Sequence, residues 1–215
     1  MKYIVHYGAM RQLGVFSYTD QTLCYGSRVV VRTPRGQEIG TVRCEASPEI
    51  VAKLAKGFHE DIVIRTMTEN DEYEGRRLQV LDQENLSRCQ QIIQEMGIAM
   101  ELVRVEHIFS GERMILYYTA GERVDFRELV KVLTTELQMR IEMRQVSSRE
   151  GVKLFPCLGD CGRELCCCFM REMPTVTIKM AKIQRVTLDP SKISGHCGRL
   201  KCCLQYEHDC YVQKR

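Results

Sequence analysis

The chain has 215 residues, of which 44% are hydrophobic and 27% are charged, and its formal net charge is +3 at pH 7. These are the proportions of an ordinary globular protein, long enough for one large domain or two small ones. The sequence contains neither a signal-peptide core near residues 1–10 nor an uninterrupted apolar run of membrane-spanning length, so we expect a cytoplasmic protein without a membrane span.

The first 47 residues predict a small β domain. Short runs rich in β-branched and aromatic residues occur at 3–7, 13–18, 28–33 and 37–43. Pro34-Arg35-Gly36 supplies a turn between the last two runs. We therefore predict a small sheet or barrel over residues 1–47, followed by an irregular connector that begins at Ser47-Pro48.

Residues 58–147 alternate between strand and helix patterns. The pattern predicts strands at 59–66, 101–109, 113–120 and 141–146. One helix carries Leu86, Cys89, Ile92, Ile93 and Met96 on a single face and ends at Gly97. A second helix begins at an Asp125/Glu128 capping pair and buries residues such as Leu129 and Leu133. This order, βαββαβ, predicts a ferredoxin-like α+β domain.

The cysteines are unevenly distributed. Cys24, Cys44 and Cys89 are scattered singly, as small buried hydrophobic residues are. The other nine of the twelve cysteines lie in the last third of the chain. In a reducing cytosol such clustering indicates metal or redox chemistry and argues against a disulfide framework. We therefore define residues 148–215 as a Cys-rich, largely irregular segment, with one predicted strand at 175–181.

This segment contains a duplicated motif. Residues 159–167 (GDCGRELCC) and 195–203 (GHCGRLKCC) agree at six of nine positions, and three of the six are cysteines. Such an internal repeat indicates two half-sites for one chemical purpose. The motif cysteines are the predicted metal ligands: Cys161, Cys166, Cys167, Cys197, Cys202 and Cys203.

Thiolates are the soft ligands that zinc and iron–sulfur clusters require. The Cys-x₄-Cys step, followed at once by another cysteine, favours an iron–sulfur cluster over zinc, because two adjacent thiols fit a tetrahedral zinc site poorly. His196 is an additional candidate ligand. Arg163 and Arg199 stand two positions after a motif cysteine, where a guanidinium can stabilise negative charge on bound sulfur.

Two other classes of function stay open. The region 151–215 holds 11 Lys/Arg against 6 Asp/Glu, which would suit a zinc-stabilised RNA-binding module. Vicinal cysteines would also suit a metal-free thiol redox switch. No phosphate-binding loop, nucleophile elbow or paired-histidine protease motif is present, so we expect a protein that is not an enzyme.

The sequences DCGRELCC, VDFRELVK, RVVVRTPRGQEIGTV and TVTIKMAKIQRVTLDPSKISGHCGRLKCCLQYE together resemble the YaaT (RicT) family. Members of this family carry a PSP-one C-terminal domain and are known as stage-zero sporulation proteins. The likeness covers about residues 28–207. Cys157 and Cys168 stand where the family pattern has glycine or another small residue, and they are therefore further candidate ligands.

This resemblance implies a function. In a spore-forming relative the family member joins two small helical proteins in a cytosolic complex that binds 4Fe–4S clusters. That complex is linked to the endoribonuclease RNase Y, to mRNA maturation and to the sporulation phosphorelay. The resemblance thus implies an iron–sulfur regulatory protein that acts through protein contacts, with at most weak RNA binding.

Overall fold

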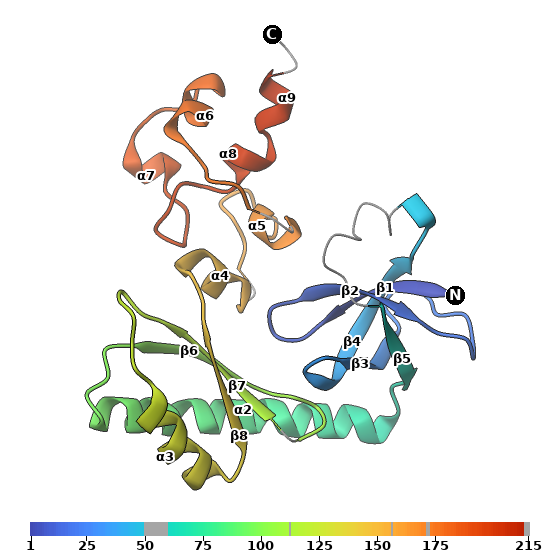
Figure 1. Cartoon of the computed structure of the whole chain (residues 1–215). Helices are drawn as coiled ribbons and strands as arrows, with labels where there is room; N and C mark the ends of the chain where they lie inside the picture. The colour runs from blue at the N-terminus through green and yellow to red at the C-terminus, as the bar shows by residue number, and fades with distance from the viewer. Residues whose placement is uncertain (50–59, 112, 156, 171–172, 213–215) are drawn as a thin grey trace. The chain divides into compact units, whose positions relative to one another are not determined.

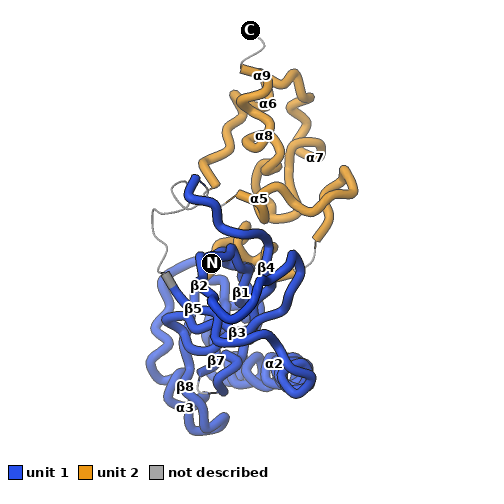
Figure 2. The backbone as a smooth tube through the Cα atoms, turned by 90° about the vertical axis from the view of Figure 1, so that its right-hand side faces the viewer, with its two compact units in different colours: residues 1–145 blue, residues 146–215 orange. Residues whose placement is uncertain are grey.

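A computed structural model describes residues 1–49, 60–111, 113–155, 157–170 and 173–212. The chain divides into two compact units, Met1–Gln145 and Val146–Arg215; Figure 2 colours the first blue and the second orange. The first unit contains both regions that the sequence analysis separates at residues 47–58. The connector predicted after Ser47-Pro48 lies mostly outside the described residues.

The first unit begins with a closed five-stranded barrel (Figure 1). Its strands are β1 (Lys2–Tyr7), β2 (Gln12–Ser17), β3 (Arg28–Thr33), β4 (Gly36–Glu45) and β5 (Glu60–Thr66). They follow the order β1-β2-β5-β3-β4, and β1 pairs with β4 to close the barrel. Only β2 and β5 are parallel among these pairs. The predicted N-terminal sheet or barrel is confirmed.

Alternating apolar side chains fill the barrel. Val29 and Val31 on β3, with Val5 and Phe16 from β1 and β2, are fully buried in its core. These residues are mostly β-branched or aromatic, and such side chains pack well on a pleated surface.

The strand predicted at 59–66 belongs to this barrel. As β5 it pairs with β2 and β3, and β6 (Glu101–His107), β7 (Arg113–Thr119) and β8 (Arg140–Gln145) form a separate three-stranded sheet. The ferredoxin-like βαββαβ arrangement is therefore not confirmed, although the α+β class is. Without β5, strands β2 and β3 would each have an unpaired edge, and β5 forms backbone hydrogen bonds with both. The strand pattern alone cannot assign β5 to the barrel or to the three-stranded sheet.

Two helices pack against the three-stranded sheet and complete its core (Figure 1). They are α2 (Glu69–Glu95) and α3 (Arg127–Leu137), and α3 connects the parallel strands β7 and β8. Cys89 and Ile93 of α2 meet Leu129 and Leu133 of α3 in one buried cluster. The predicted burial of these residues is confirmed.

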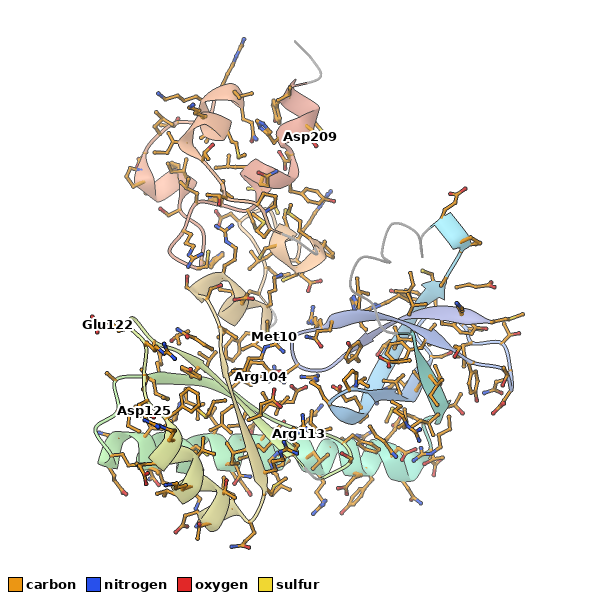
Figure 3. The ribbon with its side chains drawn as sticks, in the orientation of Figure 1. Met10, Arg104, Arg113, Glu122, Asp125 and Asp209 are labelled. Atoms are coloured by element: carbon orange, nitrogen blue, oxygen red, sulfur yellow. The ribbon has the colours of Figure 1, made fainter. Side chains whose placement is uncertain are left out.

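The ends of these helices follow local chemistry. Thr68 and Asp71 form a capping box at the start of α2, and Gly97 takes a φ of +64° just beyond its end. At α3 the predicted capping pair is wrong. Asp125, labelled in Figure 3, binds the side chain and backbone N–H of Arg127, while Glu128 binds Lys131. The N-cap residue is Phe126, which has no capping side chain.

A buried ionic cluster joins the barrel to the sheet within the first unit. Arg35, in the turn between β3 and β4, donates to Glu106 of β6 at 3.2 Å and also binds Glu38. The Tyr117 hydroxyl donates to Glu106 at 2.5 Å, and the Ala9 N–H donates to the other oxygen of that carboxylate. Glu38 and Glu106 are only 3% and 8% exposed. One guanidinium thus forms ion pairs with two carboxylates that are buried away from water.

The second unit consists of short helices and loops. The helices are α4 (Ser148–Lys153), α5 (Cys166–Phe169), α6 (Ile178–Ile183), α7 (Pro190–Ile193), α8 (Cys203–Tyr206) and α9 (His208–Val212). Among its described residues, one small apolar cluster contains four buried side chains: Val176, Ala181, Ile193 and Leu204.

The strand predicted at 175–181 is wrong. Residues from Ile178 onward form helix α6, which buries Ala181. In the described part of this unit, β-pairing is limited to two isolated bridges, so the segment has no neighbouring strand to hydrogen-bond with. Local β propensity is then overridden by packing.

Among the described residues, no helix has both the length and the apolar character needed to cross a membrane. The longest, α2, carries charged side chains along its whole length.

The ionic cluster predicts a large stability difference between two arginine variants. Arg35→Met leaves the carboxylates of Glu38 and Glu106 buried without their cation, and we expect a loss of about 3–5 kcal/mol in the free energy of unfolding. Arg127→Met breaks an exposed pair with Asp125 and should change the free energy of unfolding far less than Arg35→Met does. Urea unfolding of the full-length chain, followed by circular dichroism, measures both. Equal effects would show that the buried cluster does not hold the unit together.

Candidate metal centre

The two copies of the duplicated motif fold in the same way. In the first copy Gly159 N–H donates to Arg163 O at 2.8 Å, and Gly162 N–H donates to Gly159 O at 2.9 Å. In the second copy the same bonds join Gly195 to Arg199 at 2.7 Å and Gly198 to Gly195 at 3.0 Å. We call these two turns the first knuckle (residues 159–163) and the second knuckle (residues 195–199).

Each knuckle depends on one glycine and closes a short bridge. Gly162 has a φ of +74° and Gly198 a φ of +71°, conformations that side chains rarely adopt. The flanking backbone forms an antiparallel bridge in each copy, Leu158 with Glu164 and Ser194 with Leu200. The glycine that follows each first cysteine is therefore required by the backbone turn.

Each knuckle leads into one helical turn that carries the paired cysteines. Met170 N–H donates to Cys166 O in the first copy, and Tyr206 N–H donates to Cys202 O in the second. These turns form α5 and α8, which lie against each other. The repeat seen in the sequence is thus a repeat in structure, with the first motif cysteine on each knuckle. The paired motif cysteines begin α5 in the first copy, and in the second copy they are the N-cap and the first residue of α8.

All six motif cysteines line one cavity of about 1160 Å³ within the second unit. His196, Arg163 and Arg149 also line it. Among the described residues, Cys157 and Cys168 do not line it, and Arg199 lines a neighbouring groove together with Arg149. Cys89 is buried as predicted, whereas Cys24 and Cys44 are exposed, so their assignment as buried residues is wrong.

A polar contact joins the two copies at the cavity. Lys201 binds the Asp160 carboxylate, and His196 Nε2 lies 3.7 Å from the same carboxylate. The hydrogen bond from Lys201 lowers the pKa of Asp160. Asp160 and His196 occupy equivalent positions in the repeat. Two of the three positions at which the copies differ, Asp160/His196 and Leu165/Lys201, therefore place complementary groups side by side.

The thiols are close enough to oppose one another's ionisation. Burial raises the pKa of Cys166 to about 11, and the neighbouring sulfurs of Cys202, Cys203 and Cys161 add to that rise. A hydrogen bond with Cys167, followed by burial, raises the pKa of Cys202. Several thiolates packed together repel one another, and a bound cation removes that cost.

This donor set fits a thiolate-ligated metal or iron–sulfur cluster, which takes four cysteine ligands. The six motif cysteines are the residues that would hold it. In the described ranges, no three His, Cys, Asp or Glu side chains are already arranged to hold a metal ion. The soft ligands therefore surround one space, and their side chains would have to turn inward to bind.

Arg149 is a cavity residue that the sequence does not predict. It lies twelve residues before Cys161, on α4, outside both copies of the motif. Neither its spacing nor its neighbours distinguish it from a surface arginine, so the sequence carries no signal for it.

Comparison with known proteins agrees with the sequence resemblance. Residues 61–146 match the PSP1 C-terminal conserved region, and residues 175–215 match the third domain of PSP1-like proteins. The chain is 42% identical over 194 residues to "Stage 0 sporulation protein YaaT" of Bacillus subtilis, a match that covers 87% of this chain and 68% of that protein. No solved structure matches the chain. With this identity over most of both chains, the protein belongs to the YaaT family of PSP1 proteins.

Proposed function

We propose that this chain is a non-enzymatic iron–sulfur regulatory protein of the cytoplasm. The single observation that carries the proposal is the cavity lined by all six cysteines of two identically folded repeats. Soft thiolates in this number suit a 4Fe–4S cluster, whose thiolate ligation would cross-link α5, α8 and both knuckles and supply a one-electron redox centre.

The biological role is proposed from family membership. The relative is named a stage 0 sporulation protein, and we extend a regulatory role in sporulation to this chain. The family resemblance further leads us to propose a complex with small helical proteins that modulates RNase Y-dependent mRNA processing and, in spore formers, the developmental phosphorelay. In this role the second unit carries the cluster, and the chain acts through protein contacts.

The weak core of the second unit supports a structural role for the bound group. In the described part of this unit, the apolar cluster around Ala181 has four buried residues, fewer than either apolar cluster of the first unit. Metal ligation contributes folding free energy where hydrophobic burial is small. A cluster bridging both copies of the motif would therefore stabilise this unit as well as respond to oxidation.

A zinc-stabilised RNA-binding module is the second candidate. It is favoured by the basic groove next to the cysteine cavity, which is lined by Arg149, Lys153 and Arg199 with Glu150 as its acidic residue. A metal-free thiol switch is the third candidate, because the vicinal cysteines could oxidise reversibly.

Metal and sulfide analysis of protein purified without oxygen separates these candidates. We expect a brown protein with broad absorption near ~400 nm and about four irons and four sulfides per cluster. A colourless protein with stoichiometric zinc would favour the second candidate. A protein that takes up neither metal but forms a reversible disulfide would favour the thiol switch.

Serine substitutions test whether both repeats serve one site. Cys166→Ser and Cys202→Ser should each remove most of the bound iron, because a hydroxyl is a poor ligand for a soft metal. Cys24→Ser, at an exposed position in the first unit, is the control and should leave iron content unchanged. Limited proteolysis should show the second unit loosened and the first unit intact.

Half of the iron retained in each single variant would show two independent sites instead of one. Loss of iron from the Cys24 variant would place the site elsewhere in the chain.

RNA binding by the isolated chain should be weak and should fall steeply as salt increases, since exposed lysines and arginines contact phosphates only diffusely. Fluorescence anisotropy with a labelled single-stranded RNA at about 50 and 200 mM salt measures this. Tight, sequence-selective binding that persists at the higher salt would support the RNA-binding module over a regulator that works through protein contacts.

A further inference from the structure

Arg149 connects helix α4 to the second copy of the motif. Its Nη2 donates to the carbonyl oxygen of Leu200 at 2.8 Å. Leu200 pairs with Ser194 in the bridge that closes the second knuckle, and it lies two residues before Cys202. The same arginine lines the cavity that contains the six thiols. Its guanidinium therefore both anchors a ligand-bearing loop and faces the candidate site.

One nitrogen of this guanidinium has no partner. Among the described residues, the Arg149 Nε is buried and makes no hydrogen bond. An arginine N–H can only donate, and a buried donor without an acceptor destabilises the fold. Three carboxylates line the cavity together with the thiols, those of Asp160, Glu164 and Glu207, and Asp160 is already bound by Lys201. The six sulfurs, once they are ionised, outnumber these carboxylates as acceptors.

Lys153 adds a second positive charge on the same helix. It lies one helical turn after Arg149, and α4 lies against α5, which carries Cys167 (Figure 1). Lys153 lines the groove next to the cavity, and Arg149 lines both. Helix α4 thus places two cationic side chains close to the cysteine site.

We propose that Arg149 is a positioning residue of the cysteine site, which fixes the second knuckle through Leu200 and donates its Nε–H to the anionic sulfur of the loaded centre. This inference rests on the proposed metal-binding function. A metal centre with four thiolates carries net negative charge, and outer-shell donors orient its ligands and adjust its potential. The unpaired donor then gains its partner when the site is filled.

Three substitutions separate the two parts of this role. Arg149→Met removes charge and donor, Arg149→Gln keeps a neutral donor, and Arg149→Lys keeps the charge without the planar guanidinium. Lys179→Gln, an exposed position on α6 outside the cavity lining, controls for the loss of one positive charge. Full-length protein is reconstituted with ferrous iron and sulfide, and both iron release to a chelator and the reduction potential are measured.

We expect iron release to be about tenfold faster in the Met and Gln variants, the usual effect of losing an outer-shell partner. The reduction potential should become more negative in both variants, because the more negative reduced cluster is no longer stabilised by a nearby positive charge. Arg149→Lys should restore the potential but not the release rate. The Lys179 variant should match wild type in both measurements.

Wild-type release and potential in Arg149→Met would overturn the inference and leave the proposed function intact. Faster release with an unchanged potential in all three variants would reduce Arg149 to an anchor of the knuckle and overturn its role as a donor to sulfur. If the wild type binds zinc and no cluster, zinc transfer to a chelator gives the same comparison. A wild-type chain that binds neither metal overturns both proposals. If Arg149→Met does not fold, the comparison of Arg149→Gln with Arg149→Lys tests the inference instead.

Discussion

The mutual repulsion of closely packed thiols is the constraint on which the second unit depends. Each of four motif cysteines, at 166, 167, 202 and 203, has its pKa raised by its surroundings. Without a cation the thiols stay protonated and make only weak hydrogen bonds. Bound to the proposed metal centre, they would become strong ligands that join two loops and two helical turns. Groups that oppose one another's ionisation would then stabilise the unit.

The first unit is built on the opposite principle. It has two larger apolar clusters, and the buried charged cluster of Arg35, Glu38, Glu106 and Tyr117 is internally hydrogen-bonded. With the proposed metal centre, the chain would combine this α+β unit with a small unit that metal ligation stabilises.

The duplicated motif explains how so small a unit can assemble a multi-thiol site. Each copy folds locally, through a glycine at positive φ and bonds that span at most four residues. Because each half folds locally, forming the site requires only that the two halves pack together. This costs less conformational entropy than ordering one longer irregular loop. The Asp160–Lys201 contact connects the two halves, and the Arg149–Leu200 hydrogen bond connects the second half to helix α4.

The sequence by itself determined the barrel strands, the helix faces around Cys89 and Leu129, and the six cysteines of the candidate site, because these follow from local periodicity and an internal repeat. The sequence also identified the family, because its motifs are long enough to be specific. It did not determine that β5 belongs to the barrel, that residues 178–183 are helical, or that Cys24 and Cys44 are exposed. It also did not identify Arg149. Each of these depends on which distant segment supplies a hydrogen-bond partner or a packing surface, and only the tertiary structure decides that.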